Sequence, residues 1–138
     1  MAQVSVTREL EQSVEQVWGL VSDFGNISWM PAGTECKLEG EGPGMIRHIA
    51  AGDTTLDETL ESVDDATRTL VYTIPGELPF PATDYRSTMV VREKGSGSEL
   101  TWSCTYEPKG DPAQAQAVME GLYGTLAGWV ADALKSGS

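Results

Sequence analysis

Hydrophobic and polar residues alternate most regularly in residues 45–60, MIRHIAAGDTTLDETL. Alternation with a period of two is typical of β-strands, and Gly52-Asp53 in the middle of the segment suits a tight hairpin turn. A two-residue turn at that point places Arg47 directly opposite Glu58. The pattern therefore predicts a hairpin whose mostly apolar face carries one arginine and one glutamate.

This ion pair has two interpretations. Burial of two charges carries a desolvation cost that their attraction does not always repay, so Arg47 and Glu58 on an apolar face indicate a polar spot inside a pocket. A salt bridge at the rim of the sheet fits the sequence equally well. His48 faces Asp57 on the other side of the hairpin, and we interpret them as a surface pair because no serine or cysteine is placed to complete a catalytic triad.

The same period predicts further strands before and after the hairpin. They lie at residues 3–10, 34–38, 68–74, 84–93 and 100–106. The intervening segment 75–83, PGELPFPAT, contains three prolines and cannot be a central strand, because proline lacks a backbone donor. Its apolar residues Leu78 and Phe80 would form either a lid over a cavity or a loop packed on the domain.

Two short helices are predicted after the first strand. Ser13 and Gln16 have the spacing of a capping box, and apolar residues at helical spacing follow up to about Gly25. Residues 26–30 are predicted to form the second short helix, which Pro31 terminates.

A long amphipathic helix is predicted from Pro112 to about Lys135. Its broad apolar arc collects Val118, Met119, Leu122, Tyr123, Leu126, Trp129, Val130, Ala133 and Leu134. Gly121, Gly124 and Gly128 fall together on the opposite arc. We interpret these glycines as tolerated on a solvent-facing side; the alternative is close approach of another backbone.

The order of elements predicts one α+β domain over residues 1–138. The predicted sheet has seven mostly antiparallel strands, and its apolar face must be covered. Only one long helix is available as a cover. A curved sheet wrapped around that helix can enclose a cavity between the two.

Composition excludes several classes of partner. The chain has 21 acidic and 9 basic residues and a net charge of −12, which argues against nucleic acid and against anionic membranes. No signal peptide or transmembrane segment is visible, and Cys36 and Cys104 lack CxxC spacing, so we expect a cytoplasmic protein without stable membrane anchoring. One histidine and two scattered cysteines cannot form a standard zinc site, so we expect no metal and no cofactor. The oligomeric state is not predicted.

Three motifs resemble the START-like (SRPBCC) superfamily, which includes the birch pollen allergen, plant abscisic-acid receptors and polyketide cyclases. They are Gly44-Met-Ile-Arg47, Glu58-x-Leu60-Glu61-x-x-Asp64-Asp65 and Tyr85-Arg86-Ser87, and the resemblance spans essentially the whole chain. It implies the helix-grip fold, in which a curved sheet surrounds the C-terminal helix. The nearest members are bacterial polyketide cyclase/dehydrase-type proteins.

The resemblance also implies which residues line the cavity. In the abscisic-acid receptors the equivalents of Ile49, Glu58, Tyr72, Ile74, Tyr85 and Ser87 contact the ligand. The receptors' gate loop corresponds to the segment around Gly52-Asp53, and their latch lies near Leu78-Pro79. This chain has Ala50-Ala-Gly-Asp-Thr54 in place of the gate sequence and lacks the latch sequence, so a hormone-receptor role is not predicted.

Two classes of function follow. The favoured one is binding or transport of a small hydrophobic ligand such as a lipid, an isoprenoid or an aromatic polyketide. The predicted ligand-contacting residues are Arg47, Ile49, Leu56, Glu58, Tyr72, Ile74, Leu78, Tyr85, Ser87, Met89, Trp102, Leu122 and Leu126. The alternative is a polyketide cyclase or dehydratase, in which Glu58 would be the general acid or base and Tyr85 would donate to an enolate oxygen. Arg47 beside Glu58 weakens that alternative, because it opposes protonation of the carboxylate.

Overall fold

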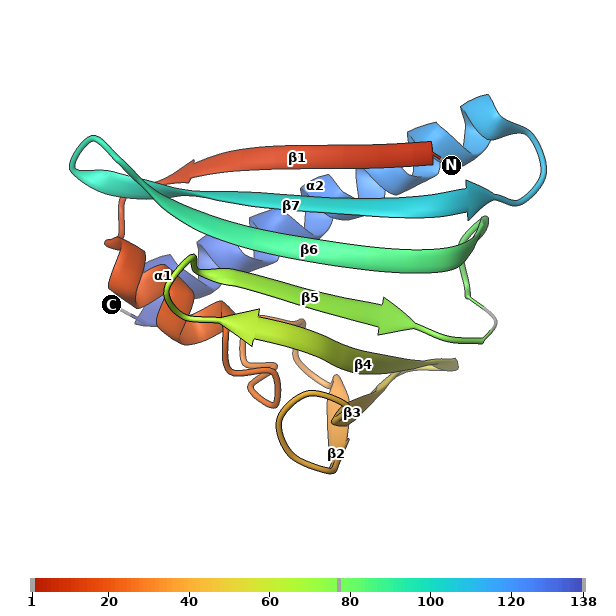
Figure 1. The fold of residues 1–138 in the computed structure, drawn as a ribbon, viewed down its shortest axis with the longest axis horizontal. Helices are drawn as coiled ribbons and strands as arrows, with labels where there is room; N and C mark the ends of the chain where they lie inside the picture. Colours follow the sequence, from red (N-terminus) through yellow and green to blue (C-terminus); the bar gives the residue numbers. More distant parts are fainter. Residues whose placement is uncertain (1, 77, 138) are drawn as a thin grey trace.

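The computed structural model describes residues 2–76 and 78–137, and over these residues the chain forms seven strands and two helices (Figure 1). The elements are β1 (Ala2–Leu10), α1 (Val14–Val21), β2 (Glu35–Glu39), β3 (Ile46–Ala51), β4 (Thr54–Asp64), β5 (Thr69–Ile74), β6 (Ala82–Lys94), β7 (Gly97–Pro108) and α2 (Pro112–Gly137). The strands form one antiparallel sheet in the order β1-β7-β6-β5-β4-β3-β2. This confirms the predicted α+β arrangement of a seven-stranded sheet and a long C-terminal helix.

Helix α2 runs across one face of the sheet and packs against β1 and β7 (Figure 1). Its fully buried side includes Met119, Tyr123 and Val130. Val118, which was predicted to lie on the apolar arc, is instead 48% exposed, because it lies at the edge of the arc away from this contact. Among the described residues, helix α2 thus packs tightly on the β1–β7 part of this face and makes no comparable contact with the strands at its other end.

The glycine stripe of α2 faces open space within the described chain. A Cβ atom added at Gly121, Gly124 or Gly128 would meet no heavy atom within 4 Å. No backbone of the described residues approaches these positions. Within this chain, the tolerance interpretation therefore holds.

Helix α1 begins with the predicted capping box. Ser13 accepts a hydrogen bond from the Gln16 backbone, and the Gln16 side chain accepts one from the Ser13 backbone. The helix ends at Val21, before Gly25. Its buried side chains add to the core beside α2.

The prediction of a second short helix at residues 26–30 was wrong. Two turns occupy this stretch instead, closed by Asn26 N donating to Asp23 O and Met30 N donating to Ile27 O, both at 2.9 Å. The Asn26 side chain also accepts from the Ser28 backbone at 3.0 Å, which favours a turn over a helix. A segment this short also lacks enough residues to offset the cost of helix nucleation.

The β3–β4 hairpin has the predicted register. Arg47 pairs with Glu58, and Ala51 pairs with Thr54 across the turn. Gly52 in the turn has φ +62°, a left-handed conformation that glycine adopts without strain. Since a slip of one residue would move every side chain to the opposite face, this register decides which residues point toward α2.

Candidate ligand-binding cavity

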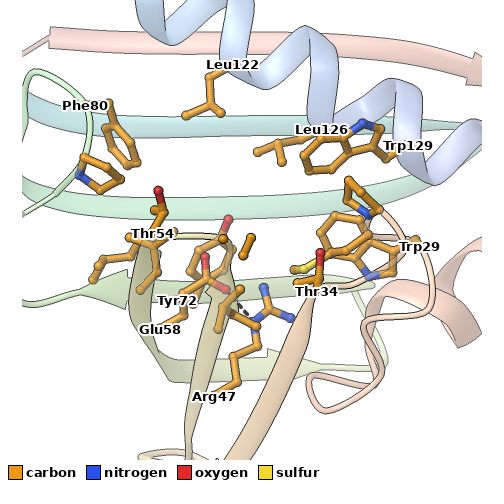
Figure 2. A pocket seen from close by; sticks show the side chains of 18 of the residues that line it. Trp29, Thr34, Arg47, Thr54, Glu58, Tyr72, Phe80, Leu122, Leu126 and Trp129 are labelled. Carbon is orange, nitrogen blue, oxygen red and sulfur yellow. Dashed lines mark hydrogen bonds and ion pairs between the residues drawn. The ribbon is translucent and has the colours of Figure 1, made fainter.

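A cavity of about 530 Å³ lies between α2 and the face of the sheet (Figure 2). Leu122, Leu126 and Trp129 of α2 lie on one side of it, and the β3–β4 hairpin carries Arg47 and Glu58 on the other. Pockets of roughly 300–1,000 Å³ are the usual size for small-molecule sites. The complete lining is Trp29, Met30, Pro31, Ala32, Gly33, Thr34, Arg47, Ile49, Ala51, Gly52, Thr54, Leu56, Glu58, Tyr72, Ile74, Pro79, Phe80, Tyr85, Trp102, Leu122, Leu126 and Trp129.

Most of the residues predicted to contact a ligand line this cavity. They are Arg47, Ile49, Leu56, Glu58, Tyr72, Ile74, Tyr85, Trp102, Leu122 and Leu126. The strand residues among them come together because the period of two in β3–β7 places them on the face toward α2. Leu122 and Leu126 face them from α2.

Leu78, Ser87 and Met89 do not line the cavity. Met89 is fully buried where β6 pairs with Leu70 of β5 and Trp102 of β7, and Ser87 is fully buried behind Trp102. Leu78, in the loop before β6, packs against the core. Alternation identifies the inward face of a strand, but it does not show how far along the strand a void extends.

One wall of the cavity was not predicted from the sequence. Residues 29–34 line it although they belong to no helix or strand. The apolar run Trp29-Met30-Pro31 was the available signal, and its assignment to a helix obscured it. Pro79 and Phe80 also line the cavity, while Leu78 packs on the core, so the loop before β6 combines the two predicted arrangements.

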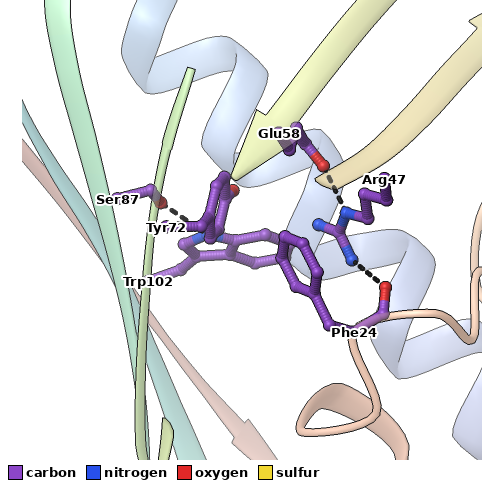
Figure 3. A network of polar contacts seen from close by, with 6 residues as sticks. All are labelled: Phe24, Arg47, Glu58, Tyr72, Ser87 and Trp102. Atoms are coloured by element: carbon purple, nitrogen blue, oxygen red, sulfur yellow. Dashed lines mark hydrogen bonds and ion pairs between the residues drawn. The ribbon is translucent and has the colours of Figure 1, made fainter. Parts of the chain in front are cut away.

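Arg47 and Glu58 form a buried ion pair at the cavity wall (Figure 3). Arg47 Nε donates to Glu58 Oε1 at 2.5 Å, and the two residues are 1% and 7% exposed. Arg47 Nη1 donates to the carbonyl oxygen of Phe24 at 3.0 Å. The guanidinium carbon lies 4.0 Å from the centre of the Phe24 ring and 5.4 Å from that of Tyr72. The pair therefore faces inward, and the alternative of a salt bridge at the sheet rim was wrong.

A chain of buried hydroxyl groups lies beside this pair. Trp102 Nε1 donates to Ser87 Oγ at 3.0 Å and to the Tyr72 hydroxyl at 3.3 Å (Figure 3). Ser87 Oγ is 2.7 Å from the Tyr123 hydroxyl, which in turn is hydrogen-bonded to the Tyr85 hydroxyl.

Burial keeps these phenols protonated. It raises the pKa of Tyr72 to about 12, and it raises the pKa of both Tyr85 and Tyr123 well above the ordinary value. The tyrosines of the cavity region are therefore neutral hydrogen-bonding groups near pH 7.

His48 lies on the opposite side of the hairpin, as predicted. Its Nδ1 is 2.6 Å from Asp57 Oδ1, and its Nε2 is 3.3 Å from Glu39 Oε1. The hydrogen bond to Asp57, followed by the one to Glu39, raises the pKa of His48. This cluster is exposed and lies away from the cavity.

The described residues show no cluster of metal-binding side chains and no membrane-spanning helix. Residues 2–76 and 78–137 contain no group of three or more His, Cys, Asp or Glu side chains that could hold a metal ion. Among the same residues, neither helix is long and apolar enough to span a membrane.

An antiparallel sheet that grips a long C-terminal helix, with a cavity between them, defines a helix-grip domain of the START-like class. Residues 1–137 match the family model described as "Polyketide cyclase / dehydrase and lipid transport". The chain belongs to this family. A comparison with curated proteins found no match.

Solved structures show the same fold. An uncharacterised protein of Bacillus thuringiensis is 31% identical with a TM-score of 0.84, and the match covers 96% of this chain and 98% of that one. XoxI of Bacillus cereus is 32% identical with a TM-score of 0.82, with 97% and 96% covered. Norcoclaurine synthase of Thalictrum flavum, solved with dopamine and hydroxybenzaldehyde, is 22% identical with a TM-score of 0.74, with 98% and 84% covered, and it shares the fold.

Proposed function

We propose that this protein binds or carries a small, largely apolar molecule, such as a lipid, an isoprenoid or an aromatic polyketide, in the cavity between the sheet and α2. The observation that carries the proposal is the cavity itself: about 530 Å³, walled mainly by apolar and aromatic side chains, with few polar groups. This combination is typical of small-molecule sites. The family description, which includes lipid transport, supports the same class of ligand.

The cysteines of the chain fit a reducing compartment. Cys36 and Cys104 are both free thiols, and free thiols are usual in cytoplasmic proteins. We therefore propose a cytoplasmic ligand for a cytoplasmic protein.

Cavity filling tests the proposal with a matched control. Leu126 lines the cavity, whereas Val118 lies on the same helix, outside the cavity and 48% exposed. Leu126→Trp should weaken binding of the neutral fluorophore phenylnaphthylamine by about tenfold or more, because the added indole occupies the space of the ligand. Val118→Trp should leave binding unchanged. Equal affinities for wild type and both variants, measured by fluorescence titration, would refute binding in this cavity.

A second candidate is a polyketide cyclase or dehydratase that uses Glu58, Arg47 and Tyr85. It is favoured by a carboxylate and a phenol that both lie on the wall of the cavity. It is weakened by the hydrogen bond from Arg47, which occupies one Glu58 oxygen that proton transfer would need. We rank the binding function first for this reason.

Glu58→Gln separates the two candidates. If Glu58 transfers a proton, the substitution should reduce turnover of aromatic polyketide precursors by roughly 10²–10⁴-fold while phenylnaphthylamine still binds. If the protein is a carrier, wild type should show no turnover of these precursors, and the substitution should change only affinity or stability. If wild type turns over these precursors and Glu58→Gln loses that turnover but still binds, the carrier proposal is refuted in favour of the enzyme.

A further inference from the structure

One terminal nitrogen of Arg47 has no hydrogen-bond partner. Nε donates to Glu58 and Nη1 donates to the Phe24 carbonyl oxygen, which leaves Nη2. Within the described part of the chain, Nη2 is the one buried side-chain nitrogen or oxygen that lacks a partner. A buried donor without an acceptor costs free energy, so an acceptor that relieves this cost would bind favourably.

The unpaired nitrogen belongs to a group on the cavity wall. Figure 2 shows the Arg47 guanidinium group below the space that the lining side chains enclose, with Glu58 and Tyr72 on one side and Thr34 on the other. The guanidinium carbon lies over the rings of Phe24 and Tyr72, 4.0 and 5.4 Å from their centres. Since an N–H group donates in the plane of the guanidinium group, a ligand acceptor would meet Nη2 in that plane, from the cavity that Arg47 lines.

Charge balance decides which kind of acceptor fits. Glu58 already neutralises Arg47 at 2.5 Å. A ligand carboxylate would add an uncompensated negative charge to a mostly apolar cavity, in a chain whose net charge is already −12. A carbonyl oxygen accepts a hydrogen bond from Nη2 without adding charge.

We propose that Arg47 Nη2 is the polar anchor of this cavity and that the ligand is an apolar molecule with a neutral carbonyl oxygen, such as a ketone or an ester. The inference rests on the proposed binding function and specifies its ligand class. Arg47 here binds the ligand through Nη2, while Glu58 and the Phe24 carbonyl hold the guanidinium group in place.

Three probes of similar shape test the anchor in the wild-type protein. They are acetylanthracene, isopropylanthracene and anthracene carboxylate, all substituted at the same ring position, with affinities measured by calorimetry. The ketone should bind about 10- to 100-fold more tightly than the hydrocarbon, because a hydrogen bond from a charged donor is worth that much in affinity. The carboxylate should bind most weakly.

Each other result refutes the anchor, the neutral acceptor or the binding function. Equal affinities for the ketone and the hydrocarbon would refute the anchor and leave the binding function intact. Tightest binding of the carboxylate would refute a neutral acceptor. Failure of all three probes to bind would refute the anchor and the proposed binding function together.

A double variant tests the role of Arg47 itself. Arg47→Met with Glu58→Gln removes the donor without leaving a buried unpaired charge, and it should abolish the preference for the ketone over the hydrocarbon. Val118→Met is the matched control on α2 outside the cavity, where Val118 is exposed, and it should keep the preference. If the double variant does not fold, the Arg47 side-chain N–H resonances of wild type provide the readout. They should shift on addition of the ketone and not of the hydrocarbon, and equal shifts would refute the anchor.

Discussion

The two sides of α2 have different neighbours. On the side that packs against β1 and β7, Met119, Tyr123 and Val130 are fully buried. On the side toward the β3–β4 hairpin, Leu122 and Leu126 are only partly buried and line the cavity. Both sides are apolar, so the helical pattern does not distinguish a side packed against strands from a side that faces a void. The shape of the sheet makes that distinction.

The largest expected effect on the free energy of unfolding concerns the Arg47–Glu58 ion pair at the cavity wall. Arg47→Met should lower the free energy of unfolding by about 3–5 kcal/mol, because it leaves Glu58 buried without its partner. The double variant with Glu58→Gln should recover much of this loss. Urea unfolding of the two variants measures the difference, and equal destabilisation would show that the buried charge is not the cause.

The next effect compares the two sides of α2 directly. Met119→Ala on the packed side should cost about 2–5 kcal/mol, since it creates a new cavity in a filled core. Leu122→Ala should cost about 1 kcal/mol, because that side chain already faces open space. Equal losses in urea unfolding would mean that the two sides are packed alike.

A pH titration examines the buried hydroxyl chain between the two sides. Burial raises the pKa of Tyr72 to about 12 and raises those of Tyr85 and Tyr123 well above the ordinary value, whereas unfolded tyrosines ionise near pH 10. Deprotonation therefore favours the unfolded state, and the free energy of unfolding should fall as the pH rises above about 10.

Tyrosinate absorbance provides the measurement. The chain has four tyrosines, and these three should ionise only as the protein unfolds. Ionisation of more than one tyrosine while the circular dichroism is still native would contradict the burial of this network.

The smallest effect on stability is expected from His48, on the outer face of the hairpin, away from the cavity. The raised pKa of His48 means that its ion pairs with Asp57 and Glu39 stabilise the fold fully below its ordinary value of 6.5. That stabilisation is lost as the pH rises through the raised pKa. The stability difference between wild type and His48→Gln should therefore shrink with rising pH, and ligand affinity should be unchanged. A stability difference that grows with pH would contradict stabilisation by protonated His48.

The hairpin was the part of the site that the sequence could predict. Gly52-Asp53 determines the turn, the turn determines the register, and the register places Arg47 opposite Glu58 on the inner face. These are local relations within one short segment. Alternation together with the family resemblance predicted most of the cavity-facing residues of the other strands.

The remaining wall depends on contacts between distant segments. Arg47 bonds the carbonyl oxygen of Phe24, which lies 23 residues earlier in the chain, and residues 29–34 then follow along the cavity. No periodic pattern marks this loop, because it is held by backbone turns, the hydrogen bond from Arg47 to Phe24 and the packing of Trp29 against Trp102. The same limit explains Met89, which is on the predicted face but lies where the core is filled.

The central claim is that a ligand occupies the space between α2 and the hairpin, and the tryptophans allow a direct test. Of the four tryptophans, Trp29, Trp102 and Trp129 line the cavity. Trp18 lies outside that lining, with its Nε1 hydrogen-bonded to Asp65 at 2.8 Å. In fluorotryptophan-labelled protein, addition of phenylnaphthylamine should shift the fluorine resonances of the three cavity tryptophans and leave that of Trp18 in place. A shift of Trp18 alone, or no shift at any of the four, would contradict the claim.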